Sequence, residues 1–128
     1  MPLVKIHLRK GKGEEYVRLV SEAIHEALVS EASVPPDDKF HIVHQLEPSD
    51  LIAHPSYGEV SRSAELIVVE ITLNAGRSVE IKRNIYRRMA RNLERAVELR
   101  PDDLLVSLVE VSKENWSFGR GVATYAVE

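Results

Sequence analysis

The sequence predicts an α+β fold in which two tandem β-α-β units form a four-stranded mixed sheet with two helices on one face. Two observations predict it. A stretch of the chain repeats at a constant spacing, over residues 3–46 and 68–111, and each copy reads as strand, helix and strand. Duplicated units constrain a whole fold because each copy must bury its apolar face against the other. We expect residues 1–128 to form a single domain built from both copies.

The two copies align without a gap. Identical pairs include Val4 and Val69, Ile6 and Ile71, Leu8 and Leu73, Gly11 and Gly76, and the tripeptides Pro36-Asp37-Asp38 and Pro101-Asp102-Asp103. The apolar pattern agrees at many other positions. One ancestral unit therefore accounts for most of the chain.

Each element of the unit follows from local pattern. Residues 3–8 and 66–73 are β-rich runs that end near a glycine, as strands do. Apolar residues then recur at helical spacing: Val17, Val20, Ile24, Ala27 and Leu28 in the first copy, and Ile81, Ile85, Met89, Leu93 and Val97 in the second. Ser78 is predicted to cap the second helix. Prolines 35, 36 and 101 end the helices, and strands over residues 39–46 and 104–111 follow.

The predicted sheet has one face without cover. A strand–helix–strand unit has parallel strands and a right-handed crossover, so both helices lie on one face. Residues 66–71 and 104–111 are apolar on both sides, which is typical of strands buried on both faces. The short tail, residues 119–127, is the only segment left to cover the second face. We therefore expect an obligate oligomer.

Composition excludes several classes of function. The absence of Cys rules out disulfides, thiolate catalysis and zinc–thiolate sites. No long apolar run or charged-then-apolar leader is present, so we expect a cytoplasmic protein without a membrane partner. The net charge of −3 offers no general attraction to nucleic acid. The five His show no metal-ligand pattern, and we expect no metal site. One face of the second helix is basic and is interpreted as solvated: Lys82, Arg83, Arg87, Arg88, Arg91 and Arg95.

Pro2 directly follows Met1 and begins the first strand. Removal of Met1 is expected because proline is small, and the chain would then begin with a secondary amine. A chain-end amine titrates at roughly 7.7–8.0. It can act as a base, an acid or a nucleophile toward a carbonyl. Alternatively, Pro2 only starts an edge strand, where a missing N–H costs nothing.

A duplicated β-α-β unit, a proline after the initiator methionine and a sheet that needs partners together resemble the tautomerase superfamily. The closer resemblance, over essentially the whole chain, is to malonate semialdehyde decarboxylase and its relatives. The segments that carry it are Pro2-Leu3-Val4-Lys5, Val34-Pro35-Pro36-Asp37-Asp38-Lys39-Phe40, Gly76-Arg77-Ser78 and Asn115-Trp116-Ser117-Phe118-Gly119.

The resemblance implies a homotrimeric enzyme without cofactors that acts on a small 2-oxo or 3-oxo carboxylate. Pro2 would be the catalytic amine, Asp38 would activate water or set the charge of the proline, and Arg77 would hold the substrate carboxylate. Trp116, Phe118 and Tyr125 would form an apolar wall. The second arginine of the decarboxylase, two residues before the counterpart of Arg77, is missing here, so a two-arginine clamp is not expected.

Three alternatives stay open at this point. An enol–keto tautomerase, acting on a compound such as phenylenolpyruvate, would use the same proline. A non-catalytic trimeric binding protein on this scaffold would be compatible with a retained Met1. Because Pro-Asp-Asp occurs in both copies and only one has a terminal amine, Asp38 also belongs to a structural turn that leads into a strand.

Overall fold

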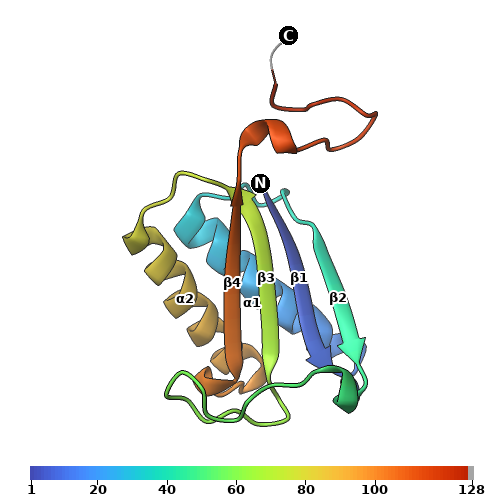
Figure 1. The fold of residues 1–128 in the computed structure, drawn as a ribbon, viewed down its shortest axis with the longest axis vertical. Coiled ribbons are helices and arrows are strands. Elements are labelled where there is room, and N and C mark those ends of the chain that lie inside the picture. Colours follow the sequence, from blue (N-terminus) through green and yellow to red (C-terminus); the bar gives the residue numbers. More distant parts are fainter. Residues whose placement is uncertain (127–128) are drawn as a thin grey trace.

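A four-stranded sheet with two helices on one face forms the body of the protein (Figure 1). The computed structural model describes residues 1–126. The main elements are β1 (Pro2–Arg9), α1 (Glu14–Ala32), β2 (His41–Leu46), β3 (Ile67–Asn74), α2 (Val79–Val97) and β4 (Leu104–Val111). The strands lie in the order β2-β1-β3-β4. β1 is parallel to β2, β3 is parallel to β4, and β1 is antiparallel to β3, which confirms the predicted fold class.

The duplication is visible in the register of the central pair. Lys5 lies opposite Glu70, its own counterpart in the second copy. On either side, Val4 lies opposite Ile71 and Ile6 lies opposite Val69. The two copies are therefore related by an approximate two-fold axis through the Lys5–Glu70 pair. One consequence matters for function: each end of the sheet carries the start of one unit and the end of the other.

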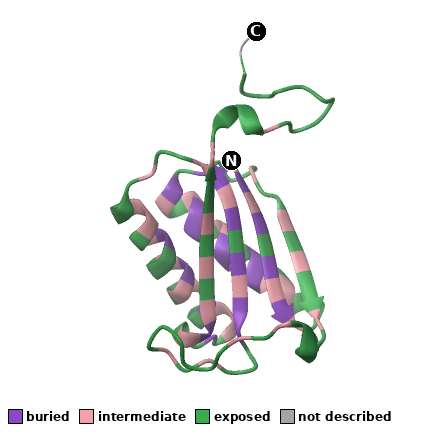
Figure 2. Ribbon diagram, in the orientation of Figure 1, coloured by how far each residue is buried: buried purple, intermediate pink, exposed green. Residues whose placement is uncertain are grey.

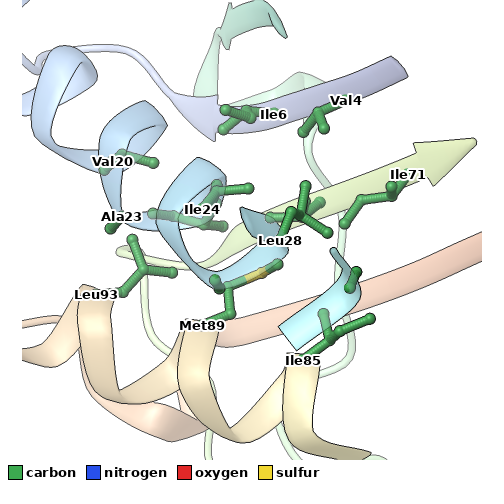
Figure 3. Packing of buried hydrophobic residues seen from close by; sticks show 14 of the residues in the cluster. Val4, Ile6, Val20, Ala23, Ile24, Leu28, Ile71, Ile85, Met89 and Leu93 are labelled. Carbon is green, nitrogen blue, oxygen red and sulfur yellow. The ribbon is translucent and has the colours of Figure 1, made fainter. Parts of the chain in front are cut away.

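The core lies between the sheet and the helices (Figure 3). Alternate residues of β1 and β3 point toward the helices and are buried, as the period of a strand requires. They meet the apolar stripes of α1 and α2, which include Ile24, Leu28, Ile85, Met89 and Leu93, each with no exposed surface. Burying one such side chain stabilises the fold by about 1.5–3 kcal/mol. This core holds both ends of the sheet in place.

Helix ends follow the predicted signals, with one boundary moved. Ser78 caps α2 by accepting a hydrogen bond from the Ile81 amide at 3.2 Å. β2 begins at His41 instead of residue 39. The reason is a tight turn: the Asp38 amide donates to the Pro35 carbonyl at 3.0 Å, and the Lys39 amide donates to Asp37 at 3.1 Å. The turn delays the start of the strand to His41, although the Phe40 carbonyl already accepts a hydrogen bond from the Val4 amide of β1 at 2.9 Å.

The sheet face opposite the helices is open in this chain. It presents the exposed apolar side chains of Ile42, Leu105 and Val109, and β4 shows intermediate and exposed residues along most of its length (Figure 2). The tail runs beyond the end of the sheet instead of over this face (Figure 1); Val127, its predicted last residue, lies outside the described part of the chain. No helix among the described residues is long and apolar enough to cross a membrane.

A histidine on the helix side of β2 is a site of pH sensitivity. His41 Nδ1 lies 2.7 Å from the Ser21 hydroxyl of α1 in a hydrogen bond, whereas Nε2 is buried and meets no partner within residues 1–126. Burial lowers the pKa of His41 to about 4, and the charges of Lys39 and His25 add to the lowering. Between pH 6.5 and pH 4, His41 is therefore mostly neutral in the folded protein and mostly protonated in the unfolded chain.

This difference predicts a loss of stability in acid. The free energy of unfolding should be independent of His41 above pH 6.5 and should fall as the pH drops from 6.5 toward 4, because the unfolded state binds more protons. Chemical denaturation across this range should give a shallower decline for His41→Gln than for the native chain. His44→Gln, on the exposed face of the same strand, serves as the control. Equal slopes for the native chain and His41→Gln would refute the assignment.

Candidate active site

One end of the sheet gathers the candidate site residues predicted from the sequence, although they are far apart along the chain. Parallel pairing places the starts of β1 and β2 together, and antiparallel pairing places Pro2 opposite Leu73 near the end of β3. The end of β4 lies beside the end of β3. Asp38 precedes β2, Arg77 follows β3, and Trp116 follows β4. The topology therefore brings these segments to the start of β1.

The chain-end amine lies next to Asp38. Because the chain described carries Met1, the nitrogen of Pro2 is an amide, and the amine in question belongs to Met1, one residue upstream. It lies 3.7 Å from Asp38 Oδ2, and the side chains of Met1 and Asp38 are 4% and 16% exposed. Asp38 Oδ1 is buried and has no hydrogen-bond partner among the described residues. The Asp38 carboxylate is thus free to interact with an amine or with a bound molecule.

Burial and three nearby charged groups shift the pKa of this amine. Burial lowers the pKa of the Met1 amino group below its usual value. Asp38 opposes that effect because its negative charge and hydrogen bond favour the protonated form, whereas Arg77 and Lys113 favour the neutral form. The balance is a lowered pKa. An amine at this position is therefore more available as a base or nucleophile than an exposed chain end would be.

Arg77 is held rigidly between two elements. Its Nε and Nη2 donate to the carbonyl of Ala32 at 3.3 and 2.9 Å, and Nη1 donates to the carbonyl of Asn74 at 3.1 Å. Ala32 is the last residue of α1, so Arg77 also satisfies a carbonyl at a helix end. A guanidinium has five N–H groups; those not used in these bonds are available to a carboxylate within the described structure. Charged pairing of this kind is strong and directional.

An apolar pocket of about 180 Å³ adjoins the amine and is lined by Met1, Leu3, Phe40, Trp116, Ser117 and Phe118. Trp116 Nε1 donates to Asn74 Oδ1 at 2.8 Å, which fixes the indole ring. Phe118 lies 5.9 Å from Trp116 and 6.3 Å from Phe40 between ring centroids. Tyr125 packs on Phe118 at 5.2 Å and is not among the lining residues. Trp116 and Phe118 thus form the wall, and Tyr125 supports it.

Sequence reasoning did not assign a role to two members of this group, Phe40 and Asn74. Phe40 closes the pocket from the start of β2, and Asn74 holds both Arg77, through its carbonyl, and Trp116, through its side chain. The closeness of Phe40 to Asp38, two residues earlier in the sequence, could have indicated that Phe40 lies near the site. No signal pointed to Asn74, because its two partners come from segments after β3 and after β4.

The second copy of Pro-Asp-Asp shows what is special about Asp38. Its counterpart, Asp103, is fully buried and accepts bonds from the amide and hydroxyl of Ser63, each at 2.6 Å. Arg100 lies 3.4 Å from the same carboxylate. Asp103 therefore ties a loop to the sheet, whereas Asp38 in the same turn has no such protein partner.

The chain belongs to the tautomerase superfamily, in the branch that resembles malonate semialdehyde decarboxylase. Two models described as "Tautomerase enzyme" match residues 38–119 and 2–60. The chain is 37% identical to the probable tautomerase YusQ of Bacillus subtilis (strain 168), over 96% of this chain and 97% of the relative.

Two solved structures support the same conclusion. A malonate semialdehyde decarboxylase studied in wild-type, mutant and inactivated forms is 32% identical with a TM-score of 0.88, over 94% of this chain and 93% of the other. The FG41 malonate semialdehyde decarboxylase inhibited by 3-bromopropiolate is 29% identical with a TM-score of 0.90, over 96% and 93% of the two chains. The resemblance drawn from sequence motifs is thereby confirmed.

The contrast between the two aspartates gives a prediction about stability. Asp103→Ala should lower the free energy of unfolding by about 1–3 kcal/mol, because it removes a fully buried carboxylate that accepts two hydrogen bonds from Ser63. Asp38→Ala should cost less than Asp103→Ala, because Asp38 lies 3.7 Å from the chain-end amine and its Oδ1 has no hydrogen-bond partner among the described residues. Denaturant titration of both variants measures the difference. Equal losses would mean that Asp38 has the same structural task as Asp103.

Proposed function

We propose that the protein is a cofactor-independent enzyme in which Pro2, after loss of Met1, acts on a small 2-oxo or 3-oxo carboxylate. The observation that carries the proposal is the chain-end amine, that of Met1 in the chain described, lying 3.7 Å from Asp38, whose Oδ1 is buried without a hydrogen-bond partner among the described residues. The family relationship supports an enzyme, and the likeness to malonate semialdehyde decarboxylase supports this class of substrate.

Met1 occupies the place that a substrate would need. Its side chain is almost fully buried and lines the apolar pocket. Removing it would enlarge that pocket and expose a secondary amine on Pro2, which itself lies buried at the start of β1. The strand would lose no hydrogen bond, because proline has no backbone N–H to donate. One processing step would thus make both the reactive group and the space beside it.

The surrounding side chains have separable roles in this proposal. Arg77 binds the substrate carboxylate through its free N–H groups, held in place by Ala32 and Asn74. The neutral amine of Pro2 adds to the substrate carbonyl, whose oxygen leaves as water, and the resulting iminium takes up the electron pair of the breaking C–C bond as a 3-oxo acid loses carbon dioxide. Protonation at carbon and hydrolysis of the iminium then release the product and restore the amine. Asp38 orients water or returns a proton. Trp116 and Phe118 exclude bulk water from the reacting carbon.

A second candidate, an enol–keto tautomerase, is favoured by the lowered pKa of the amine and by the name of the Bacillus subtilis relative. A neutral Pro2 would remove a proton from the enol oxygen and deliver one to carbon. This reaction needs no covalent intermediate. The two candidates therefore differ in whether an iminium forms.

Reductive trapping tests the proposal. Treatment with borohydride and a panel of 2-oxo and 3-oxo acids should add mass to a chain that begins at Pro2, with the adduct on the N-terminal peptide. Arg77→Gln should lower both trapping and kcat/KM by roughly 10–100-fold, because a charged hydrogen bond contributes about 1.5–3 kcal/mol. Arg83→Gln, exposed on α2, should leave both unchanged.

Each other outcome has a defined meaning. A processed chain that turns over an enol substrate without any adduct would establish the tautomerase and reject the iminium route. A chain that keeps Met1 in the cell would overturn catalysis by Pro2 and leave a binding role for this pocket.

We also propose that the protein is a homotrimer in which the open sheet face is covered by other copies of the chain. The exposed Ile42, Leu105 and Val109 on that face support the proposal. They lie on the two edge strands, β2 and β4, with Lys5 and Glu70 of the central strands between them, so neighbouring copies at both edges would cover them. The copy that covers β4 would stabilise this edge strand, which carries two of these residues.

Sedimentation velocity checks the assembly. The native chain should sediment as a trimer at micromolar concentration, and Val109→Asp should dissociate it because a charge is costly to bury without a partner. Val79→Asp, at a more exposed apolar position in the first turn of α2, should leave the trimer intact. A monomeric native chain would refute the proposal.

A further inference from the structure

The end of the sheet opposite Pro2 holds a larger cavity, of about 560 Å³. It lies next to the counterpart of the candidate pocket, which the 65-residue offset places at Leu51, Ile52, Leu66, Val68 and Leu105. Gly11 and Lys12 stand where the other copy has Gly76 and Arg77. Both glycines adopt a positive φ, 115° and 125°, so the chain leaves each strand by the same turn. The two copies thus share the same backbone turn, one at each end of the sheet.

The chemistry of this second end differs in a specific way. Ile67 takes the place of Pro2 and provides no amine. Asp103 takes the place of Asp38, but it is fully buried and bound to Ser63. Neither group that the proposed reaction requires is available here. What remains is a cavity with a cation at the position of Arg77.

The cavity is strongly basic for a chain whose net charge is −3. Four cationic side chains line it, Arg9, Lys10, Lys12 and Arg62, and Glu65 is the one carboxylate among its lining residues. They come from the end of β1, the turn after it and the loop before β3. Cations converging from separate segments raise the local potential for a small anion.

The arginines are oriented without being neutralised. Arg9 Nη2 donates to the carbonyl of Leu51 at 2.6 Å, and Nη1 donates to Ala64 at 3.3 Å. Arg62 Nη1 donates to the carbonyl of His54 at 3.0 Å. These acceptors are backbone carbonyls, so in the described chain neither guanidinium forms a salt bridge with a carboxylate. Both lysines are paired, Lys10 with Glu47 and Lys12 with Glu65 at 2.6 Å. Each guanidinium keeps spare N–H donors for an anion.

From these observations we infer that the cavity formed by Arg9, Lys12 and Arg62 is a second, non-catalytic binding site for a small anion bearing phosphate or carboxylate groups. The proposal does not depend on the chemistry at Pro2. Arg9 and Arg62 supply the directional hydrogen bonds, and Lys12 supplies charge once it exchanges Glu65 for the ligand. Pro48 and Pro55 also line the cavity, and their fixed φ angles limit how far the loop can move.

The test uses inorganic phosphate and citrate as probes on the full-length protein at low ionic strength. Titration followed by amide NMR should move the signals of Gly11, Lys12 and Ala64, and leave Gly76 in place. Calorimetry should show saturable binding that Arg62→Gln weakens about tenfold or more, as expected for the loss of a charged hydrogen bond. The matched control Arg87→Gln, exposed on α2, should bind as the native chain does.

Opposing outcomes are equally clear. Absence of saturable binding by both probes, or shifts centred on Gly76, would overturn the inference. Equal weakening in Arg62→Gln and Arg87→Gln would attribute binding to general charge and overturn it as well. Binding of citrate alone would identify carboxylate as the ligand chemistry, and binding of phosphate alone would identify phosphate. If Arg62→Gln does not fold, Lys12→Gln provides the same comparison, because its side chain forms only surface pairs.

Discussion

The antiparallel pairing of β1 with β3 is the constraint on which the rest of the structure depends. It places Lys5 opposite Glu70 and brings the start of the first unit against the end of the second. Without this register Pro2 would not lie beside the end of β3, and Arg77 would not reach the end of α1, where it donates to Ala32. A shift by one residue would also turn every core side chain of β1 to the open face. Core packing and site geometry therefore depend on the same pairing.

Gene duplication has left one turn serving two purposes. In both copies Pro-Asp-Asp ends a loop and leads into a strand. Both oxygens of Asp103 accept hydrogen bonds from Ser63, which stabilises the fold. Asp38 has one buried oxygen without a hydrogen-bond partner within residues 1–126. A buried carboxylate without donors costs free energy, so its retention beside an amine is typical of functional sites. The same argument applies to Gly11 and Gly76: the frame persists, and the side chains placed on it decide what each end does.

Much of this was predictable from sequence. The repeat, the helix periodicity and the cap at Ser78 are local patterns, and they predicted the elements to within a few residues. The start of β2 moved by two residues, from residue 39 to His41, because residues 35–38 form a turn. Position and motif predicted the candidate site residues, and the structure places all of them at one end of the sheet: Pro2, Asp38, Arg77, Trp116 and Phe118. Phe40 and Asn74 were not predicted, because their contacts are with segments that are distant along the chain.

The sequence by itself determined which residues form strands and helices and which side of each faces the core, because apolar periodicity records the geometry of a single element. Only the tertiary structure decided that β1 lies between β2 and β3, since nothing local in a strand specifies its neighbours. This strand order brings distant segments of the chain together at each end of the sheet. It left Asp38 Oδ1 without a hydrogen-bond partner among the described residues, fixed the Arg77 guanidinium, and gathered Arg9, Lys12 and Arg62 around a cavity. These properties are contacts between distant residues, and they arise when the core closes.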